Sequence, residues 1–409
     1  MFSRLQQQPV ALFYILSSLT GLVGALAHPL MSLFIVDKLN MAPALFAFYT
    51  IAVTLAGLAS SQWLANKSDR GGSNLNIYSL SVLGMSAGFV VFAFLAGLNS
   101  PSFLYILATG VFAVALGNAA IPQMLTLARA WSSEQQNIDI TQFNTRMRAA
   151  ISIAWIAGPA IAFFVAAQLS FSLAFLLAGL CGLACVSYAR RLLPAVNQAT
   201  SSAKHGDKHA APRSFWLLVA VVTLGASANV LYASAMPLYT IQELGFSAAL
   251  PGLLMASDAL LEIPVMLISA RLAKQWSKAA IFYFAFVFAI LFYIGIYHAQ
   301  SVWQFFVLQA VNAIYYGLFA GLALTFLQEQ LPTRIAFTST LCSNAIKMGT
   351  MFGSSAMGLI AQFASFRHAN LGAIVCIAFA AVCLFLHQHF KKQESKALPA
   401  NNSGLCFKS

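Results

Sequence analysis

Long apolar runs, separated by short polar segments, occupy nearly the whole of this chain. Each run has about 20 residues or more, which is the length that a helix needs to cross the hydrocarbon core of a bilayer. Because that core offers no water to backbone groups, a run that crosses it has to be helical. The pattern predicts twelve membrane-spanning helices, near residues 10–36, 43–65, 75–98, 103–128, 146–167, 171–188, 215–241, 248–270, 279–297, 302–327, 335–363 and 370–390.

The composition supports the prediction of membrane-spanning helices. Apolar residues make up 60% of the 409 residues, charged residues 8%, and the mean hydropathy is +0.79. In soluble domains about a quarter of the residues are charged. We therefore expect an all-helical protein embedded in the lipid bilayer.

The longest polar segment inside the chain, residues 190–213, follows the sixth predicted span and divides the spans six and six. The two halves also look related, since Leu and Ala followed by a cation recur where the second and eighth spans end. Faint repetition of this kind is typical of transporters built from two similar bundles. We predict an N-terminal six-helix bundle, a cytoplasmic linker, a C-terminal six-helix bundle and a cytoplasmic tail, at residues 1–189, 190–213, 214–391 and 392–409.

Basic residues lie mostly on one side of the predicted membrane, although the net charge of +12 could by itself suggest a nucleic-acid partner. Of the 22 lysines and arginines, Lys38 and Arg367 fall on the opposite side and Lys347 falls inside a span, which leaves 19 on the side of the linker and both termini. Cytoplasmic loops carry such an excess of positive charge. We predict cytoplasmic termini, an inner-membrane location in a bacterium, and no nucleic-acid partner.

Polar side chains within the spans are unevenly distributed. The third, sixth, ninth and twelfth spans hold no Asn, Gln or charged residue at depth. The other spans carry Asn118, Gln123, Arg148, Asn229, Asp258, Glu262, Gln309, Asn312, Asn344 and Lys347. Because polar groups in lipid need a partner or a wet cavity, this pattern predicts a polar central path screened by peripheral helices. The alternative is that the amides only bridge packed helices.

Arg148 and Trp155 are separated by seven residues, about two helical turns, and so project from one face of the fifth span. A guanidinium offers a planar fork of donors and an indole a flat apolar plate, which together suit a polyhydroxy ring. In the alternative interpretation, Arg148 is an anchor at the helix end and Trp155 packs against a neighbouring helix.

Two carboxylates lie one turn apart in the eighth span, Asp258 near its middle and Glu262 nearer the cytoplasm. Charges at that spacing disfavour joint ionisation, so one of the pair is a candidate for binding a transported proton. Lys347, near the middle of the eleventh span, could neutralise Asp258 as a static ion pair instead. We assign Glu262 and Asp258 as candidates for proton coupling, and Asp258 and Lys347 as a candidate charge pair.

The histidines and cysteines provide no sign of a catalytic or metal centre. His28, beside Pro29 in the first span, is a candidate at the mouth of the path, or else a packing residue. The six cysteines show no Cys-x-x-Cys spacing. A membrane enzyme would need convergent nucleophile and base groups, which scattered histidines do not supply. We expect no enzyme activity, no cofactor and no metal.

The loop after the second span, Asn66-Lys67-Ser68-Asp69-Arg70-Gly71-Gly72, resembles the loop signature of the major facilitator superfamily. The resemblance implies the twelve-helix, two-bundle fold of that family. It also implies that Asp69 and Arg70 help to lock the cytoplasmic side between conformations. The further basic pair expected after the glycines is replaced by Ser73 and Asn74.

Within that superfamily the chain resembles the bacterial sugar efflux transporters, over residues 21–362. Matching stretches are Leu30-Met31-Ser32-Leu33-Phe34, Asn118-Ala119-Ala120-Ile121-Pro122-Gln123, Leu127-Ala128-Arg129, Met147-Arg148, Ala154-Trp155, Gly158-Pro159, Met236-Pro237-Leu238, Leu261-Glu262-Ile263-Pro264, Asn312, Gly321 and Asn344. Glu262 fits the family pattern. Asp258 and Lys347 replace small neutral residues, and Ala130 stands where relatives carry an acidic partner.

The resemblance implies a monomeric transporter that exports a sugar in exchange for protons, by alternating access. Arg148 would bind the sugar hydroxyls, Trp155 would stack on the ring, and Glu262 would exchange the proton. The path would be lined by Asn118, Gln123, Asn229, Asn312, Asn344 and His28. The alternative is an exporter of drugs or other amphipathic solutes, because Gly158-Pro159 also resembles drug antiporters.

Overall fold

The structure is a computed structural model that describes residues 9–133, 135, 140–193 and 212–397. Throughout those residues the regular structure is helical, with no strand. The first half comprises α2 (Pro9–Ala27), η1 (His28–Leu30), α3 (Met31–Leu33), η2 (Phe34–Lys38), α4 (Pro43–Asp69), α5 (Asn74–Ala96), α6 (Phe103–Phe112), η3 (Val114–Ala119), α7 (Ala120–Ser133), α8 (Ile140–Gln168) and α9 (Phe171–Leu192).

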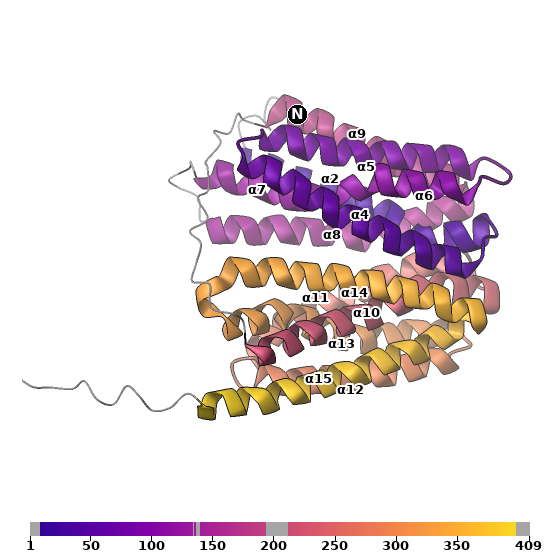
Figure 1. The fold of residues 1–409 in the computed structure, drawn as a ribbon. Helices are drawn as coiled ribbons and strands as arrows, with labels where there is room; N and C mark the ends of the chain where they lie inside the picture. The colour runs from indigo at the N-terminus through magenta and orange to yellow at the C-terminus, as the bar shows by residue number, and fades with distance from the viewer. Residues whose placement is uncertain (1–8, 134, 136–139, 194–211, 398–409) are drawn as a thin grey trace, which may run out of the picture.

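The second half repeats this plan. It comprises α10 (Arg213–Leu238), η4 (Tyr239–Glu243), α11 (Leu250–Leu272), α12 (Lys278–His298), α13 (Val302–Gln330), η5 (Pro332–Arg334), α14 (Ile335–Phe363), η6 (Phe366–His368) and α15 (Ala369–Ala397). In Figure 1 the first half forms the upper bundle and the second half the lower one. We call the end where α9 ends and α10 begins the linker side, and the opposite end the far side.

The predicted twelve-helix, two-bundle fold is confirmed. Eleven of the described spans are long and apolar enough to cross a membrane, and α14, with 29 residues, is long enough but too polar to meet the same criterion. Each predicted span coincides with a helix or a row of short helices. The predicted domain boundaries stay a prediction: residues 194–211 and 398–409 lie outside the described part, and α15 continues to Ala397, past the predicted end of the bundle.

The fourth span is interrupted in a way that the hydrophobic pattern does not predict. It changes from α-helix to 3-10 helix at Val114–Ala119 before resuming as α7. The 3-10 segment lies close against α5, since a Cβ added to Gly88 would come within 2.6 Å of the Val114 side chain. Tight packing against small residues thus accompanies the interruption.

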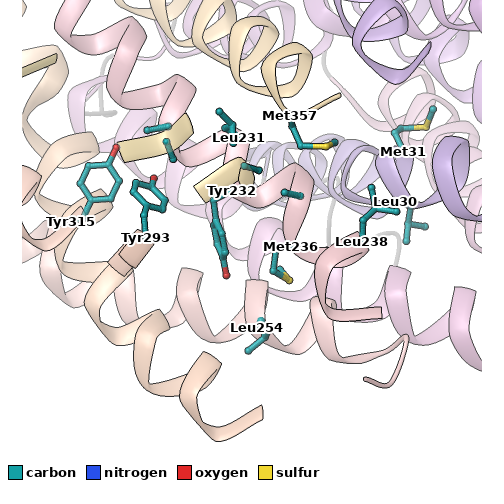
Figure 2. Close-up of a cluster of buried hydrophobic side chains, with 14 of the residues drawn as sticks. Leu30, Met31, Leu231, Tyr232, Met236, Leu238, Leu254, Tyr293, Tyr315 and Met357 are labelled. Carbon is teal, nitrogen blue, oxygen red and sulfur yellow. The ribbon is translucent and has the colours of Figure 1, made fainter. Parts of the chain in front are cut away.

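The two bundles share one continuous buried cluster. Leu30 and Met31 from the first bundle belong to the same cluster as Leu238 and Met357 from the second, and Figure 2 shows these side chains. Lipid tails are as apolar as these side chains, so packing and hydrogen bonds rather than the hydrophobic effect have to hold the bundles together here.

Glycines allow the backbones of the two bundles to approach closely on the far side. A Cβ added to Gly252, at the start of α11, would come within 2.7 Å of the Pro159 carbonyl oxygen on α8. A Cβ added to Gly358, near the end of α14, would come within 2.5 Å of the Pro43 carbonyl oxygen at the start of α4. Any larger residue at either position would push the bundles apart.

Hydrogen bonds between the bundles gather at the same far side. The Gln242 amide donates to Asp37 Oδ1 at 2.7 Å, and Thr50 Oγ1 lies 3.0 Å from Ser355 Oγ. The Ala44 backbone N–H donates to Gln362 Oε1 at 3.3 Å. These contacts join the helix ends that lie farthest from the linker, so the molecule is closed on the far side.

The Thr50–Ser355 contact gives a direct test of this closure. We expect the pair Thr50→Cys and Ser355→Cys, in a variant without the native cysteines, to form a disulfide within minutes of mild oxidation, because the two hydroxyl oxygens already lie 3.0 Å apart. Gel mobility with and without reductant measures the yield.

The matched control pairs Ser60→Cys with Ser355→Cys. Ser60 lies ten residues further along α4, about 15 Å toward the linker side. It should give little cross-link, and equal yields from the two pairs would contradict the far-side closure.

Candidate functional site

Trp155 lies on the face of α8 that turns toward the second bundle. Pro159, one turn further along on that face, contacts Gly252 of α11 through its carbonyl oxygen. Trp155 therefore lies one turn closer to the linker side than this contact. Its side chain is 40% exposed, so its indole has a face available to a ligand.

Arg148 belongs to the same helix, two turns closer to the linker side than Trp155. Its backbone is helical, as the predicted spacing requires, but its side chain lies outside the described residues. The predicted pairing of Arg148 with Trp155 around a ligand therefore stays a prediction.

Asn344 and Lys347 extend the same surface on α14. Asn344 precedes Ser355 by eleven residues, and Lys347 precedes Gly358 by eleven, which is about three turns in each case. Since Ser355 and Gly358 contact the first bundle, Asn344 and Lys347 face that bundle too, nearer the linker side. Asn344 is exposed and Lys347 is half-buried.

Asp258 and Glu262 lie on the face of α11 that packs against α13. Asn312, fully buried on α13, donates its amide N–H to Asp258 Oδ2 at 3.0 Å. One turn on, the Glu262 backbone lies against Gly317 of α13, and the Glu262 side chain is half-buried. The predicted carboxylate pair thus lies where α11 packs against α13 inside the second bundle.

The predicted ion pair between Asp258 and Lys347 does not form in this conformation. An ion pair within 4.0 Å joins Lys278 to Glu329, at the linker side. Asp258 instead obtains a neutral donor, the Asn312 amide, from the helix packed directly against it. That α13 would supply this donor could not be read from the sequence, because the pairing depends on how the helices are rotated.

Asn118 and Gln123 lie at or just beyond the interruption in the fourth span. Asn118, half-buried, packs against Gly57 of α4 so closely that a Cβ added to Gly57 would come within 2.1 Å of its amide nitrogen. Gln123 is 5% exposed. Both amides therefore contribute first to packing inside the bundle, and their assignment to the path stays a prediction.

His28 and Asn229 each lie beside an aromatic side chain. The His28 ring, exposed, meets the Phe89 ring edge-on at 5.8 Å between centroids. Asn229, half-buried on α10, lies beside Tyr316 of α13. The predicted ligand contacts of both side chains stay a prediction.

The loop that resembles the family signature ends α4 in a tight turn. Gly71 has φ of +87°, and the Gly72 N–H donates to the Lys67 carbonyl at 3.0 Å. A residue with a Cβ would be strained at Gly71, which accounts for the glycine there. Arg70 is exposed, and the Asp69 side chain lies outside the described residues, so their predicted locking role is untested.

Two tyrosines close to the carboxylates were not among the predicted site residues. Tyr232 accepts a hydrogen bond from the Gln309 amide at 2.7 Å. It also interacts electrostatically with Asp258. Tyr316 lies near both Asp258 and Glu262. A tyrosine inside a span, beside polar positions on neighbouring helices, is the signal that could have identified them.

These features define a class of protein. Two six-helix bundles, closed against each other at one end and carrying polar side chains on their facing helices, form the architecture of a membrane transporter. The sequence profile of the Major Facilitator Superfamily matches residues 13–334, and the chain belongs to that family.

The chain is also similar to individual members. It is 32% identical over 377 residues to Sugar efflux transporter B of Salmonella typhimurium, which covers 91% of this chain and 94% of that protein. It is 30% identical over 384 residues to Sugar efflux transporter A of Escherichia coli, with 92% and 94% covered. Membership of this family of transporters confirms the predicted resemblance and the expectation that the chain is not an enzyme.

Solved structures share the fold at low sequence identity. The nucleoside transporter NupG superimposes with a TM-score of 0.76 at 11% identity, covering 94% of this chain and 99% of NupG. A bacterial homologue of the human lysosomal transporter Spinster, in an inward-facing and occupied conformation, gives a TM-score of 0.75 at 15% identity, covering 95% and 97%. These likenesses confirm the fold of an integral membrane transporter.

The hydrogen bond from Asn312 to Asp258 predicts a stability effect. We expect Asn312→Leu to lower the midpoint of thermal unfolding in detergent by about 2–6 °C, because it leaves a buried carboxylate oxygen without its donor. Tryptophan fluorescence during heating measures the midpoint.

Asn344→Leu is the matched control, since it also replaces an asparagine by leucine, but at an exposed position. It should shift the midpoint by less than about 1 °C. A similar loss in both variants would show that the Asp258–Asn312 bond contributes nothing specific.

Proposed function

We propose that this protein is a secondary active transporter that exports sugars across the bacterial inner membrane in exchange for protons. The observation that carries the proposal is the similarity to sugar efflux transporters across more than nine-tenths of the chain. The polar face shared by α8, α11 and α14 provides a place for a hydrophilic substrate. The proposal includes cytoplasmic termini, which the distribution of basic residues supports, and a monomer.

The sugar site in this proposal is centred on α8. Trp155 would stack its exposed indole on the C–H face of the sugar, and Arg148 would donate to hydroxyls at the other edge. Asn344, exposed on the facing helix α14, supplies an amide from the second bundle. Asn118, Gln123, Asn229, Asn312 and His28 would shape the rest of the path.

Proton exchange is assigned to Glu262, with Asp258 one turn away. Glu262 is half-buried on α11, and α11 is the helix that contacts α8 of the other bundle through Gly252. A change in the charge of Glu262 would thus act on a helix that takes part in the contact between the bundles. The loop residues Asp69 and Arg70 would stabilise the closed state of the linker side.

The position of the contacts between the bundles supports alternating access. Closure on the far side leaves the linker side as the route of entry in this conformation, which corresponds to uptake of substrate from the cytoplasm. Opening the far side requires breaking the Thr50–Ser355 and Asp37–Gln242 contacts. Each is a neutral or single-charge hydrogen bond, so the two states can be close in free energy.

The alternative of drug export rests on Gly158-Pro159. In the structure a Cβ added to Gly158 would come within 2.5 Å of Ala25 on α2, so packing inside the first bundle accounts for this glycine. The alternative would gain support if cells that express the protein resisted drugs while their sugar transport was unchanged.

The sugar site predicts a graded effect at Trp155. In proteoliposomes assayed with a panel of labelled sugars, we expect one or more to be transported. Trp155→Ala should reduce that flux about tenfold at low sugar concentration, while Trp155→Phe, which keeps an aromatic face, should reduce it only about threefold.

Trp303→Ala is the matched control for removal of an exposed tryptophan, because Trp303 lies at the start of α13 on the far side. Its flux should stay near that of the original protein. Equal flux in Trp155→Ala and Trp303→Ala would reject stacking on Trp155.

If Glu262 exchanges the proton, Glu262→Gln should lose sugar flux driven by a pH gradient and keep the exchange of labelled for unlabelled sugar. An imposed pH gradient should accelerate sugar flux several-fold in the original protein and not in Glu262→Gln, since a permanently neutral side chain cannot exchange a proton. Exchange of labelled for unlabelled sugar without a gradient should persist in the variant.

Glu329→Gln is the control, since Glu329 is an exposed carboxylate at the linker side. It should retain the response to the gradient. The coupling assignment fails if flux in the original protein ignores the gradient, or if Glu262→Gln still responds to it.

A further inference from the structure

Three oxygen atoms, on Asp258, Asn312 and Gln309, receive no hydrogen bond in the structure. Among the described residues, Asp258 Oδ1, Asn312 Oδ1 and Gln309 Oε1 are buried and have no hydrogen-bond partner. Asn312 is fully buried and Gln309 is 1% exposed. Leaving such a group unsatisfied in a low-dielectric interior is unfavourable, and more so where the group is charged.

These oxygens lie on side chains that are in contact or one helical turn apart. Asn312 Nδ2 bonds Asp258 Oδ2 at 3.0 Å, and Gln309 lies one turn before Asn312 on the same face of α13. Gln309 Nε2 in turn donates to the Tyr232 hydroxyl at 2.7 Å, and Figure 2 shows Tyr232 within the buried cluster between the helices. The amide nitrogens of Asn312 and Gln309 thus donate hydrogen bonds, whereas the amide oxygens accept none.

The electrostatic surroundings of Asp258 also favour a positively charged ligand. Glu262, one turn away on the same helix, and Tyr232 and Tyr316 on the neighbouring helices bring no positive charge to Asp258. Lys347 forms no ion pair with Asp258 within 4.0 Å. Arg146 and Arg148, on α8, lie toward the linker side. A buried carboxylate in these surroundings is stabilised by a cation that it can bind directly.

We propose that Asp258, Asn312 and Gln309 form a binding site for Na⁺. Carboxylate and amide oxygens are the ligands that hard cations prefer. A single carboxylate balances one positive charge, so a monovalent ion leaves the site neutral and a divalent ion does not. A proton on Asp258 would provide a donor for one amide oxygen only, whereas a cation is attracted by the carboxylate and by both amide oxygens.

The site would give the transporter a second coupling ion beside the proton assigned to Glu262. This consequence rests on the proposed transport function, but the binding site itself does not. Asn312 and Asp258 connect α13 to α11, and α11 contacts the first bundle through Gly252, so an ion held there would act on a helix that forms the contact between the bundles.

The test is thermal unfolding of the purified full-length protein in detergent, without sugar, in the chloride salts of Na⁺, K⁺ and choline at constant ionic strength. We expect Na⁺ to raise the unfolding midpoint saturably, by about 2–4 °C at a concentration tenfold above half-saturation. K⁺ and choline should not reproduce the rise.

Three variants locate the effect. Asp258→Asn should abolish the Na⁺-dependent rise. Gln309→Leu, which removes one oxygen and keeps the volume, should increase the half-saturating Na⁺ concentration about tenfold, and it tests the site even if Asp258→Asn does not fold. Glu329→Gln, which neutralises an exposed carboxylate at the linker side, is the control and should keep the response.

The proposal is overturned if the original protein shows no Na⁺-specific rise, or if K⁺ and choline act equally. It is also overturned if the response in Gln309→Leu matches that of the original protein. A stabilisation that depends on acid and on Asp258 but is independent of Na⁺ would show that Asp258 binds a proton instead. Because the assay contains no sugar, its failure would leave the proposed sugar export untouched, and failure of sugar transport would leave the ion site untouched.

Discussion

The hydrocarbon core of a membrane offers no water, so each polar side chain there has to obtain its partner from the protein or face a wet cavity. This constraint explains why α5, α9, α12 and α15 are free of amides and charges at depth, while most of the helices between them carry an amide or a charge there. It also explains the bond between Asp258 and Asn312, which joins a carboxylate to a donor on the helix packed against it. The proposed function depends on polar groups that this arrangement satisfies only in part.

Contact between the bundles adds a second requirement, because their helices have to separate and meet again during transport. The far-side interface uses backbone contacts at Gly252 and Gly358 and a few hydrogen bonds between small side chains. Small residues give a close fit when the bundles meet, and weak hydrogen bonds let them part. On the same helices, the residues nearer the linker side are larger and more polar, as Trp155 and Lys347 show.

The sequence predicted the span positions well, because each apolar run has to match the bilayer thickness. Arg148 and Trp155 belong to one helix two turns apart, as their spacing predicted, and their shared face around a ligand stays a prediction. It did not predict the 3-10 segment before α7, which accompanies packing against Gly57 and Gly88. Nor did it predict that Asp258 would pair with Asn312 rather than Lys347, because a single sequence does not fix how neighbouring helices are rotated about their axes.

The modest hydropathy of α14 has a consequence for how the protein is made. Among the described helices, eleven spans are long and apolar enough to cross a membrane, and α14 does not meet the same criterion. Its Asn344 and Lys347, useful on a wet path, oppose its transfer into lipid as a single helix. Insertion of α14 therefore depends on helices already in place, such as α10 and α4, which pack against it in the finished fold. During synthesis, the second bundle can become complete only after earlier spans have prepared a surface that receives this helix.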